Sequence, residues 1–99
     1  MVVNILGEEY EIKILEKRDS CMLENNYTGY VNYDDKCIYL WKEDTWIKHI
    51  LLHELVHAYL HEAGIEFGYG IHNEDNVNFI ARMIPKISNQ FDSVKGDIK

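Results

Sequence analysis

The chain opens with two short runs in which apolar and polar residues alternate. Residues 2–6 and 9–15 form these runs, and a turn at Gly7-Glu8 separates them. Alternation with a period of two is typical of β-strands that bury one face. The second run has an apolar face made of Tyr10, Ile12 and Ile14. We therefore expect a pair of strands at the start of the chain.

A second pair of strand-like runs follows after a polar stretch. Residues 27–33 and 36–41 are rich in aromatic and β-branched side chains, and Asp34-Asp35 stands between them as a hairpin signal. Residues 17–26 show no periodicity, which predicts a loop. The four runs together predict a short antiparallel sheet, and we expect Tyr30, Tyr39, Trp41 and Trp46 to contribute to its core.

After these strands the spacing of the apolar residues changes to the period of an α-helix. The pattern predicts a helix that begins at Glu43 or Asp44 and runs to about Ala63, with Gly64 as the residue that ends it. A loop over residues 64–72 contains three glycines.

A second helix is predicted to start after Asn73, a residue type that favours the N-cap position. Its apolar face is formed by Val77, Ile80, Ala81 and Ile84. Proline lacks an N–H, so we expect Pro85 to end or kink this helix and the polar tail from Gln90 to fray.

The first helix carries the sequence His-Glu-Leu-Val-His at positions 53–57. Residues four apart share one helix face, so His53 and His57 can present two imidazoles to one metal ion. Glu54 then stands where a general base can take a proton from a metal-bound water. The pattern predicts a zinc site with Glu54 as its catalytic residue.

A catalytic zinc site needs a third protein ligand. In metzincins that ligand stands six residues after the second histidine, with a glycine midway, but here these positions hold Ala63 and Leu60. Glu74 and Asp75 on the second helix are the alternatives. At 100° per residue Glu74 lies within about 60° of Val77, whereas Asp75 lies about 160° away. We predict Glu74 as the ligand and keep Asp75 as the alternative.

Length, composition and charge limit the classes of protein to which the chain can belong. Ninety-nine residues with 46% hydrophobic content predict a single domain over residues 1–99. A net charge of −7 argues against nucleic-acid binding, and no apolar run approaches the ~20 residues of a membrane span. Without a signal peptide, and with two cysteines that form no disulfide framework, the chain is expected to be cytoplasmic.

Residues 73–78 resemble the Asn-Glu-x-x-x-Asp signature of gluzincins such as thermolysin. In that family the glutamate binds zinc and the final aspartate orients the first histidine. Asn73 and Glu74 match, but the last position is Asn78. The resemblance implies that an uncharged amide accepts the imidazole N–H here, which makes the histidine a weaker base.

Residues 27–87 also resemble the small zincin-like proteins of phages and Gram-positive bacteria, grouped with ImmA/IrrE-type metallo-endopeptidases. The matching elements are the segment from His53 to Gly64, the Asn73-Glu74-Asp75 sequence and the Phe79-Ile80-Ala81 segment before Pro85. This resemblance implies an α+β fold with a minimal zincin-like core. It also implies a Zn²⁺ ion held by His53, His57 and Glu74, and hydrolysis of a peptide or protein substrate.

Several alternatives remain open. The chain can instead be a non-catalytic zinc-binding interaction module of phage or mobile-element origin. A fourth protein ligand, such as His72, would indicate that structural role. His72 and Tyr69 are candidate oxyanion donors, or else ordinary loop residues, and the oligomeric state is not predicted. His49 and His61 complete a stripe of histidines along the first helix.

Overall fold

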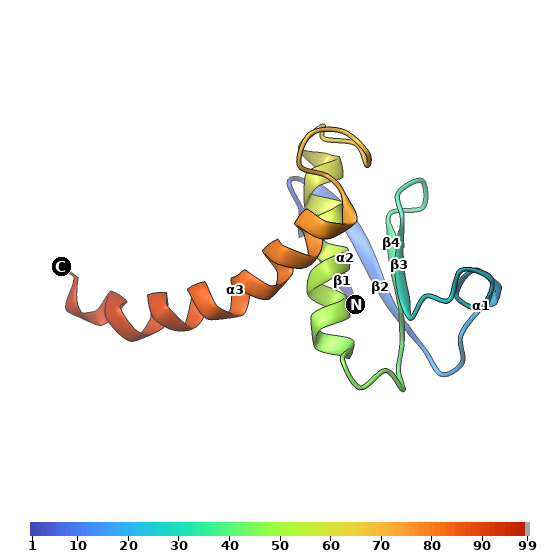
Figure 1. The fold of residues 1–99 in the computed structure, drawn as a ribbon, viewed down its shortest axis with the longest axis horizontal. Helices are drawn as coiled ribbons and strands as arrows, with labels where there is room; N and C mark the ends of the chain where they lie inside the picture. The colour runs from blue at the N-terminus through green and yellow to red at the C-terminus, as the bar shows by residue number, and fades with distance from the viewer. Residues whose placement is uncertain (99) are drawn as a thin grey trace.

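The computed structural model describes residues 1–98, which form one four-stranded sheet and three α-helices (Figure 1). In Figure 1 the sheet is seen nearly edge-on, with helix α2 against one side, α1 on the other side and α3 projecting away from α2. The elements in chain order are β1 Val2–Ile5, β2 Glu8–Leu15, α1 Ser20–Asn25, β3 Gly29–Asn32, β4 Cys37–Trp41, α2 Ile47–Glu62 and α3 Glu74–Val94, followed by a 3₁₀ turn at Lys95–Asp97.

The sheet is mixed rather than wholly antiparallel. Its strand order is β1-β2-β4-β3, and the β1–β2 and β3–β4 pairs are the two predicted antiparallel hairpins. The central pair is parallel, with Ile12 opposite Ile38. The expectation of an antiparallel sheet was therefore wrong for β2 and β4. The connection through α1 and β3 brings the second hairpin back so that β4 lies beside β2 and β3 becomes the edge strand.

The stretch predicted as a loop, residues 17–26, contains the short helix α1. Asp19 caps it, since its Oδ1 accepts the Met22 N–H at 2.9 Å, and Met22 is fully buried. Asn26 ends the helix in the left-handed conformation. Six helical residues are too few to display a helical period, which explains why the pattern did not reveal them.

Helix α2 begins at Ile47, three or four residues after the expected start at Asp44 or Glu43. The carboxylate of Asp44 accepts the Trp46 N–H at 2.6 Å in a turn that precedes the helix. The predicted end is confirmed, because Gly64 has a φ of 86° and the Ile65 N–H reaches the Leu60 carbonyl at 2.9 Å. This is the hydrogen-bond pattern of a Schellman motif.

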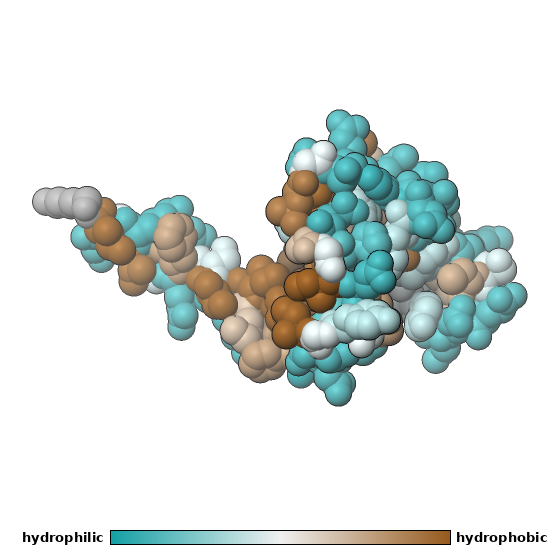
Figure 2. All heavy atoms as spheres, turned by 90° about the horizontal axis from the view of Figure 1, so that it is seen from above, coloured by the Kyte–Doolittle hydropathy of each residue, from teal (hydrophilic) through white to brown (hydrophobic). Residues whose placement is uncertain are grey.

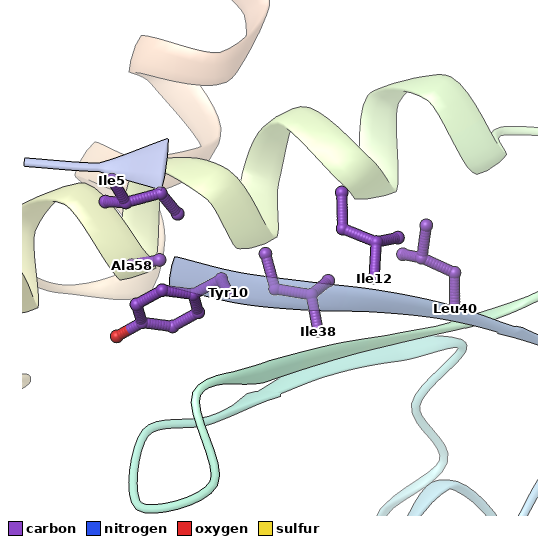
Figure 3. Packing of buried hydrophobic residues seen from close by; sticks show 6 residues of the cluster. All are labelled: Ile5, Tyr10, Ile12, Ile38, Leu40 and Ala58. Atoms are coloured by element: carbon purple, nitrogen blue, oxygen red, sulfur yellow. The ribbon is translucent and has the colours of Figure 1, made fainter. Parts of the chain in front are cut away.

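The main core lies between the sheet and α2 (Figure 3). The labelled side chains of β2 and β4 point toward α2, and Ala58 lies on the helix surface that meets them. A small side chain at this position allows the helix to approach the strands closely. The core cluster is formed by Ile5, Tyr10, Ile12, Ile38, Leu40 and Ala58.

The four aromatic residues expected in this core lie outside it. Trp46 is 71% exposed in the turn before α2. Tyr39 stands between two buried strand residues and so points to the opposite face of the sheet, where it stacks on Tyr30 with ring centroids 4.9 Å apart. Arg18 lies over the ring of Trp41 at 5.2 Å. The rings of Tyr30, Tyr39 and Trp41 therefore cover the sheet face that α2 leaves free.

Helix α3 starts as predicted but does not stop at Pro85. Asn73 caps it, because its Oδ1 accepts the Asn76 N–H at 2.9 Å. Val77 and Ala81 pack against Val56 of α2. The helix then continues through Pro85 to Val94, and its ribbon curves along the way (Figure 1). Proline removes one intrahelical hydrogen bond but leaves the others in place.

Two further features concern membrane crossing and the state of the cysteines. Among residues 1–98, no helix combines the length and apolar character that crossing a bilayer requires. Cys21 and Cys37 are both free thiols, the first partly exposed and the second buried in β4.

Candidate metal centre

Three side chains from α2 and α3 meet at one point. His53 and His57 lie one helical turn apart on α2, and their Nε2 atoms are 3.0 Å from each other. Glu74 is the first residue of α3, and its two carboxylate oxygens lie 3.0 Å from the Nε2 atoms of His53 and His57. The Asn73 cap fixes the start of α3 and thereby sets the position of Glu74.

The other ring nitrogen of each histidine has its own hydrogen-bond partner. His53 Nδ1–H donates to Asn78 Oδ1 at 2.7 Å. His57 Nδ1–H donates to His72 Nε2 at 2.7 Å, and His72 Nδ1–H donates to the Ile65 carbonyl at 2.6 Å. A carbonyl can only accept, so this chain of donors fixes the direction of every bond. The proton of each neutral imidazole on α2 is therefore held on Nδ1.

This arrangement leaves the lone pairs of three side chains facing one another. Both Nε2 atoms lack a proton in these tautomers, and the carboxylate of Glu74 carries negative charge. Burial lowers the pKa of His57 to about 4, so a proton on that ring does not resolve the crowding at neutral pH. A cation bound among these groups would offset this repulsion.

The donor set fits a zinc ion. Two imidazole nitrogens and one carboxylate oxygen form a known set of catalytic zinc ligands, and tetrahedral bonds of ~2.0–2.1 Å hold such atoms about 3.3 Å apart. The separations of 3.0 Å are close to this value. The side chain of Glu74 is 57% exposed, so the cluster opens to solvent on that side.

Glu54 lies beside the cluster without belonging to it. The group of residues able to hold a metal within residues 1–98 contains His53, His57 and Glu74 alone. Glu54 is 5% exposed, and burial, followed by the negative charge of Glu74, raises its pKa to about 8. A buried carboxylate with a pKa near neutrality is suited to accept a proton and release it again.

A cleft with a volume of about 410 Å³ opens over these residues. The segment that leads into β3 and β3 itself form one wall, and α2 forms the floor. The start of α3 and the loop before it close the far side. Its lining includes Tyr27, Gly29, Val31, Tyr33, His49, His53, Glu54, His57, Phe67, Glu74 and Asn78.

The open edge of β3 runs along this cleft. The Trp41 N–H donates to the Thr28 carbonyl at 2.9 Å, so these two opposite residues form a hydrogen-bonded pair between the strands β3 and β4. In an antiparallel pair the residues alternate, so Gly29 and Val31 turn their N–H and C=O groups outward. Gly29 also lies so close to α2 that a Cβ atom would stand 2.5 Å from Ile50 Cγ2. Only glycine therefore allows this contact between strand and helix.

The structure places the two candidates for the third ligand, Glu74 and Asp75, differently. Glu74 reaches both histidines, whereas Asp75 is exposed and lies outside the cluster, as the helical-face argument predicted. His49 lines the cleft, and the ring of His61 stacks on Tyr33, so neither joins the three ligand candidates.

His72 and Tyr69, for which a site role and an ordinary loop role were both open, do not face the cleft. His72 is fully buried, and both of its ring nitrogens are engaged, so it orients His57 instead of binding metal or facing the cleft. Tyr69 is 69% exposed and lines a separate shallow depression, so it is not an oxyanion donor here. The fold of the glycine-containing loop decides both positions, and the sequence carries no periodic signal for it.

Tyr33, which was not singled out from the sequence, lies in the cleft. It lines the cleft with Glu54, and its ring stacks on His61 with centroids 4.2 Å apart. Burial, then the charges of Glu54 and Glu74, raise the pKa of Tyr33 to about 12, so its hydroxyl keeps its proton. Period-two alternation from Val31 puts Tyr33 on the helix-facing side of the strand, and that signal could have identified it.

Comparison of the chain with protein-family models, with curated proteins and with solved structures gives no significant match.

Proposed function

We propose that the chain is a zinc-dependent metallopeptidase. One observation carries this proposal: the lone-pair groups of three residues, His53, His57 and Glu74, converge with separations of 3.0 Å, and hydrogen bonds hold both imidazole protons on the opposite side of the rings. Such outer partners fix the orientation and tautomer of metal-binding histidines.

Glu54 supplies the proton transfer in this mechanism. When bound, zinc would polarise the scissile carbonyl and lower the pKa of a water molecule at its open position toward ~7. The carboxylate of Glu54 accepts the proton from that water and passes it to the leaving amine. Its burial beside the ligand cluster keeps it within reach of both groups while limiting access by bulk water.

The substrate is proposed to be an extended peptide. The outward N–H and C=O groups of Gly29 and Val31 can pair with such a peptide as an added strand. This strand would run along the cleft and pass over the metal ligands on α2. Backbone pairing of this kind binds many sequences, so selectivity would come from the residues at the ends of the cleft.

The alternative function is a non-catalytic zinc-binding module. A closed structural site uses four protein ligands, whereas a catalytic site keeps one position open. His72 was the candidate for a fourth ligand, but its Nε2 is bonded to His57. A cluster of three groups that opens to solvent beside a buried glutamate favours the enzyme.

The first test concerns metal content. The purified protein is expected to carry about one zinc ion per chain, and His53→Ala or His57→Ala should remove it because two ligands hold zinc far more weakly than three. Inductively coupled plasma mass spectrometry measures the stoichiometry. His49→Ala is the matched control, since it changes a histidine of the same helix that lines the cleft outside the cluster. Retention of one zinc per chain in both ligand variants would refute the site.

A second test concerns Tyr33 as a hydrogen-bond donor to the developing oxyanion. Tyr33→Phe removes only the hydroxyl and is expected to lower kcat by about 10²-fold, the usual effect of losing one such donor. Zinc content and KM should change little, because the ring still stacks on His61. Tyr69→Phe, on the exposed loop, should leave kcat unchanged. An unchanged kcat in Tyr33→Phe would exclude this role.

A further inference from the structure

The outer part of α3, residues 84–94, has an apolar side that nothing in the described chain covers. Val77 and Ala81 are the buried residues of this helix. Beyond them Ile84, Ile87, Phe91 and Val94 are 39–61% exposed. Figure 1 shows this part of the helix projecting from the body. In Figure 2 hydrophobic side chains follow the projecting arm and continue into a further hydrophobic group where the arm joins the body.

The apolar positions on α3 follow the spacing of a coiled coil. Consecutive members are separated alternately by three and four residues, which is the a/d pattern that packs one α-helix along another. Pro85 and the charged residues Arg82, Lys86 and Asp92 fall between these positions. The positions in the pattern are Val77, Ile80, Ile84, Ile87, Phe91 and Val94.

A helix of this composition requires a packing partner. The outer part contains Pro85, Ser88, Asn89 and Ser93, which are weak helix formers, and its charged side chains lie off the apolar line. Isolated helices shorter than ~12–15 residues are marginal in water even with favourable sequences. The a/d spacing indicates that the missing partner is another α-helix.

Charge points to a second copy of the same chain. Residues 80–99 carry four basic and two acidic side chains, a net charge of +2. Residues 1–79 carry six basic and fifteen acidic side chains, a net charge of −9. The cationic arm of one copy is complementary to the anionic body of another, so charge favours a pairing of two arms in which the end of each arm lies toward the body of the other copy.

The start of the apolar line decides the direction of pairing. Val77 and Ile80 already pack against α2 of their own chain, through Val56, Leu52 and Leu60. A parallel pair would therefore bring two bodies into the same space. An antiparallel pair centred near Asn89 avoids this and pairs Ile84 with Val94, and Ile87 with Phe91, of the opposite copy.

We propose that two copies of this chain form an antiparallel, two-fold symmetric dimer through the outer part of α3. The same surface serves both partners, as a two-fold interface requires. The exposed seam side chains would bury on the order of 500 Å² per copy, less than the ~800 Å² per partner of a standard interface. Dimerisation is therefore expected at micromolar concentrations, and it is independent of the metal site.

Sedimentation velocity of the full chain over a range of concentrations tests this proposal. The native protein should shift from 11.7 kDa toward twice that mass as its concentration rises. Phe91→Asp places a charge in the apolar line and should raise the dimer Kd on the order of 100-fold. Asn89→Asp adds the same charge on the opposite side of the helix and should leave the dimer intact.

The controls separate loss of pairing from loss of folding. Phe91 lies outside both core clusters, so Phe91→Asp should keep its zinc content and the thermal stability of its body. A native chain that stays monomeric up to several hundred micromolar, or a Phe91→Asp variant with the native dimer Kd, would overturn the proposal. In a Cys21→Ser background, Ile84→Cys should form a disulfide with Val94→Cys of a second copy. Self-crosslinking of Val94→Cys alone would overturn the antiparallel arrangement.

Discussion

Replacement of Glu54 by glutamine is expected to lower peptide hydrolysis by a factor on the order of 10² or more, the usual contribution of a general base. Glutamine has nearly the same shape but cannot accept the proton. Because Glu54 lies beside the three ligand candidates rather than among them, the variant should keep one zinc per chain. Cleavage of a library of random peptides, followed by mass spectrometry of the new termini, measures the activity on many sequences at once.

The same variant has a stability signature that does not depend on any substrate. In the metal-free protein, burial raises the pKa of Glu54 to about 8, so the folded state favours the protonated form. The stability that this group contributes is present at low pH and is lost progressively as the pH rises from its ordinary value of ~4.3 through about 8. Above that pH the native chain must bury a carboxylate, whereas glutamine stays neutral.

Glu54→Gln should therefore raise the melting temperature of the metal-free protein at pH 9 and change it little at pH 4. A gain of about 2 kcal/mol corresponds to roughly 8–16 °C for a domain of this size. Added zinc should shrink the difference at pH 9, because a nearby cation favours the carboxylate. A variant that hydrolyses peptides at the native rate refutes the mechanism. A variant that loses zinc shows that Glu54 is a ligand instead.

The sequence predicted the parts of the site that depend on local periodicity. Helical spacing put His53 and His57 on one face, and the same geometry chose Glu74 over Asp75. The turn at Gly64 followed from the need for a residue with positive φ at the end of a helix, which glycine meets without strain. The positions of these residues agree with the structure because each depends on the period or the end of a single helix.

Features that depend on long-range packing were not predicted. The parallel pairing of β2 with β4 is decided by how two hairpins meet, and neither hairpin contains that information. His72 reaches His57 because the loop between α2 and α3 folds back on itself, and its glycines obey no period. Pro85 was expected to end or kink α3, and the helix continues past it along a curve because its other hydrogen bonds persist.

Removal of zinc is expected to lower the melting temperature by roughly 10 °C or more. The ligand candidates come from two helices, so a bound ion clamps the start of α3 to α2. An ion that binds only the folded state adds about 4 kcal/mol at a thousandfold excess over its Kd, and each kcal/mol is worth ~4–8 °C in a small domain. Differential scanning fluorimetry with and without a chelator measures the shift.

Acid should remove this stabilisation as well. Imidazoles must be unprotonated to bind zinc, so the difference between zinc-loaded and chelated protein should shrink below about pH 6. Burial lowers the pKa of His57 to about 4 in the folded, metal-free chain, whereas an exposed imidazole titrates near 6.5. The unfolded state therefore binds more protons at this histidine between these values, so the His57 contribution to the stability of the chelated protein falls with the pH, whereas the Glu54 contribution rises.

The pair Glu74→Ala and Asp75→Ala isolates the third ligand. Both residues are exposed acids in the first turn of α3, so both interact favourably with the helix dipole and each substitution costs a similar amount of helix stability. Only Glu74 reaches the imidazoles of His53 and His57. Glu74→Ala should melt near the chelated native protein and respond little to added zinc, whereas Asp75→Ala should keep the full zinc response. The reverse result would assign the ligand to Asp75, and an equal response in both variants would show that the stabilising ion binds elsewhere.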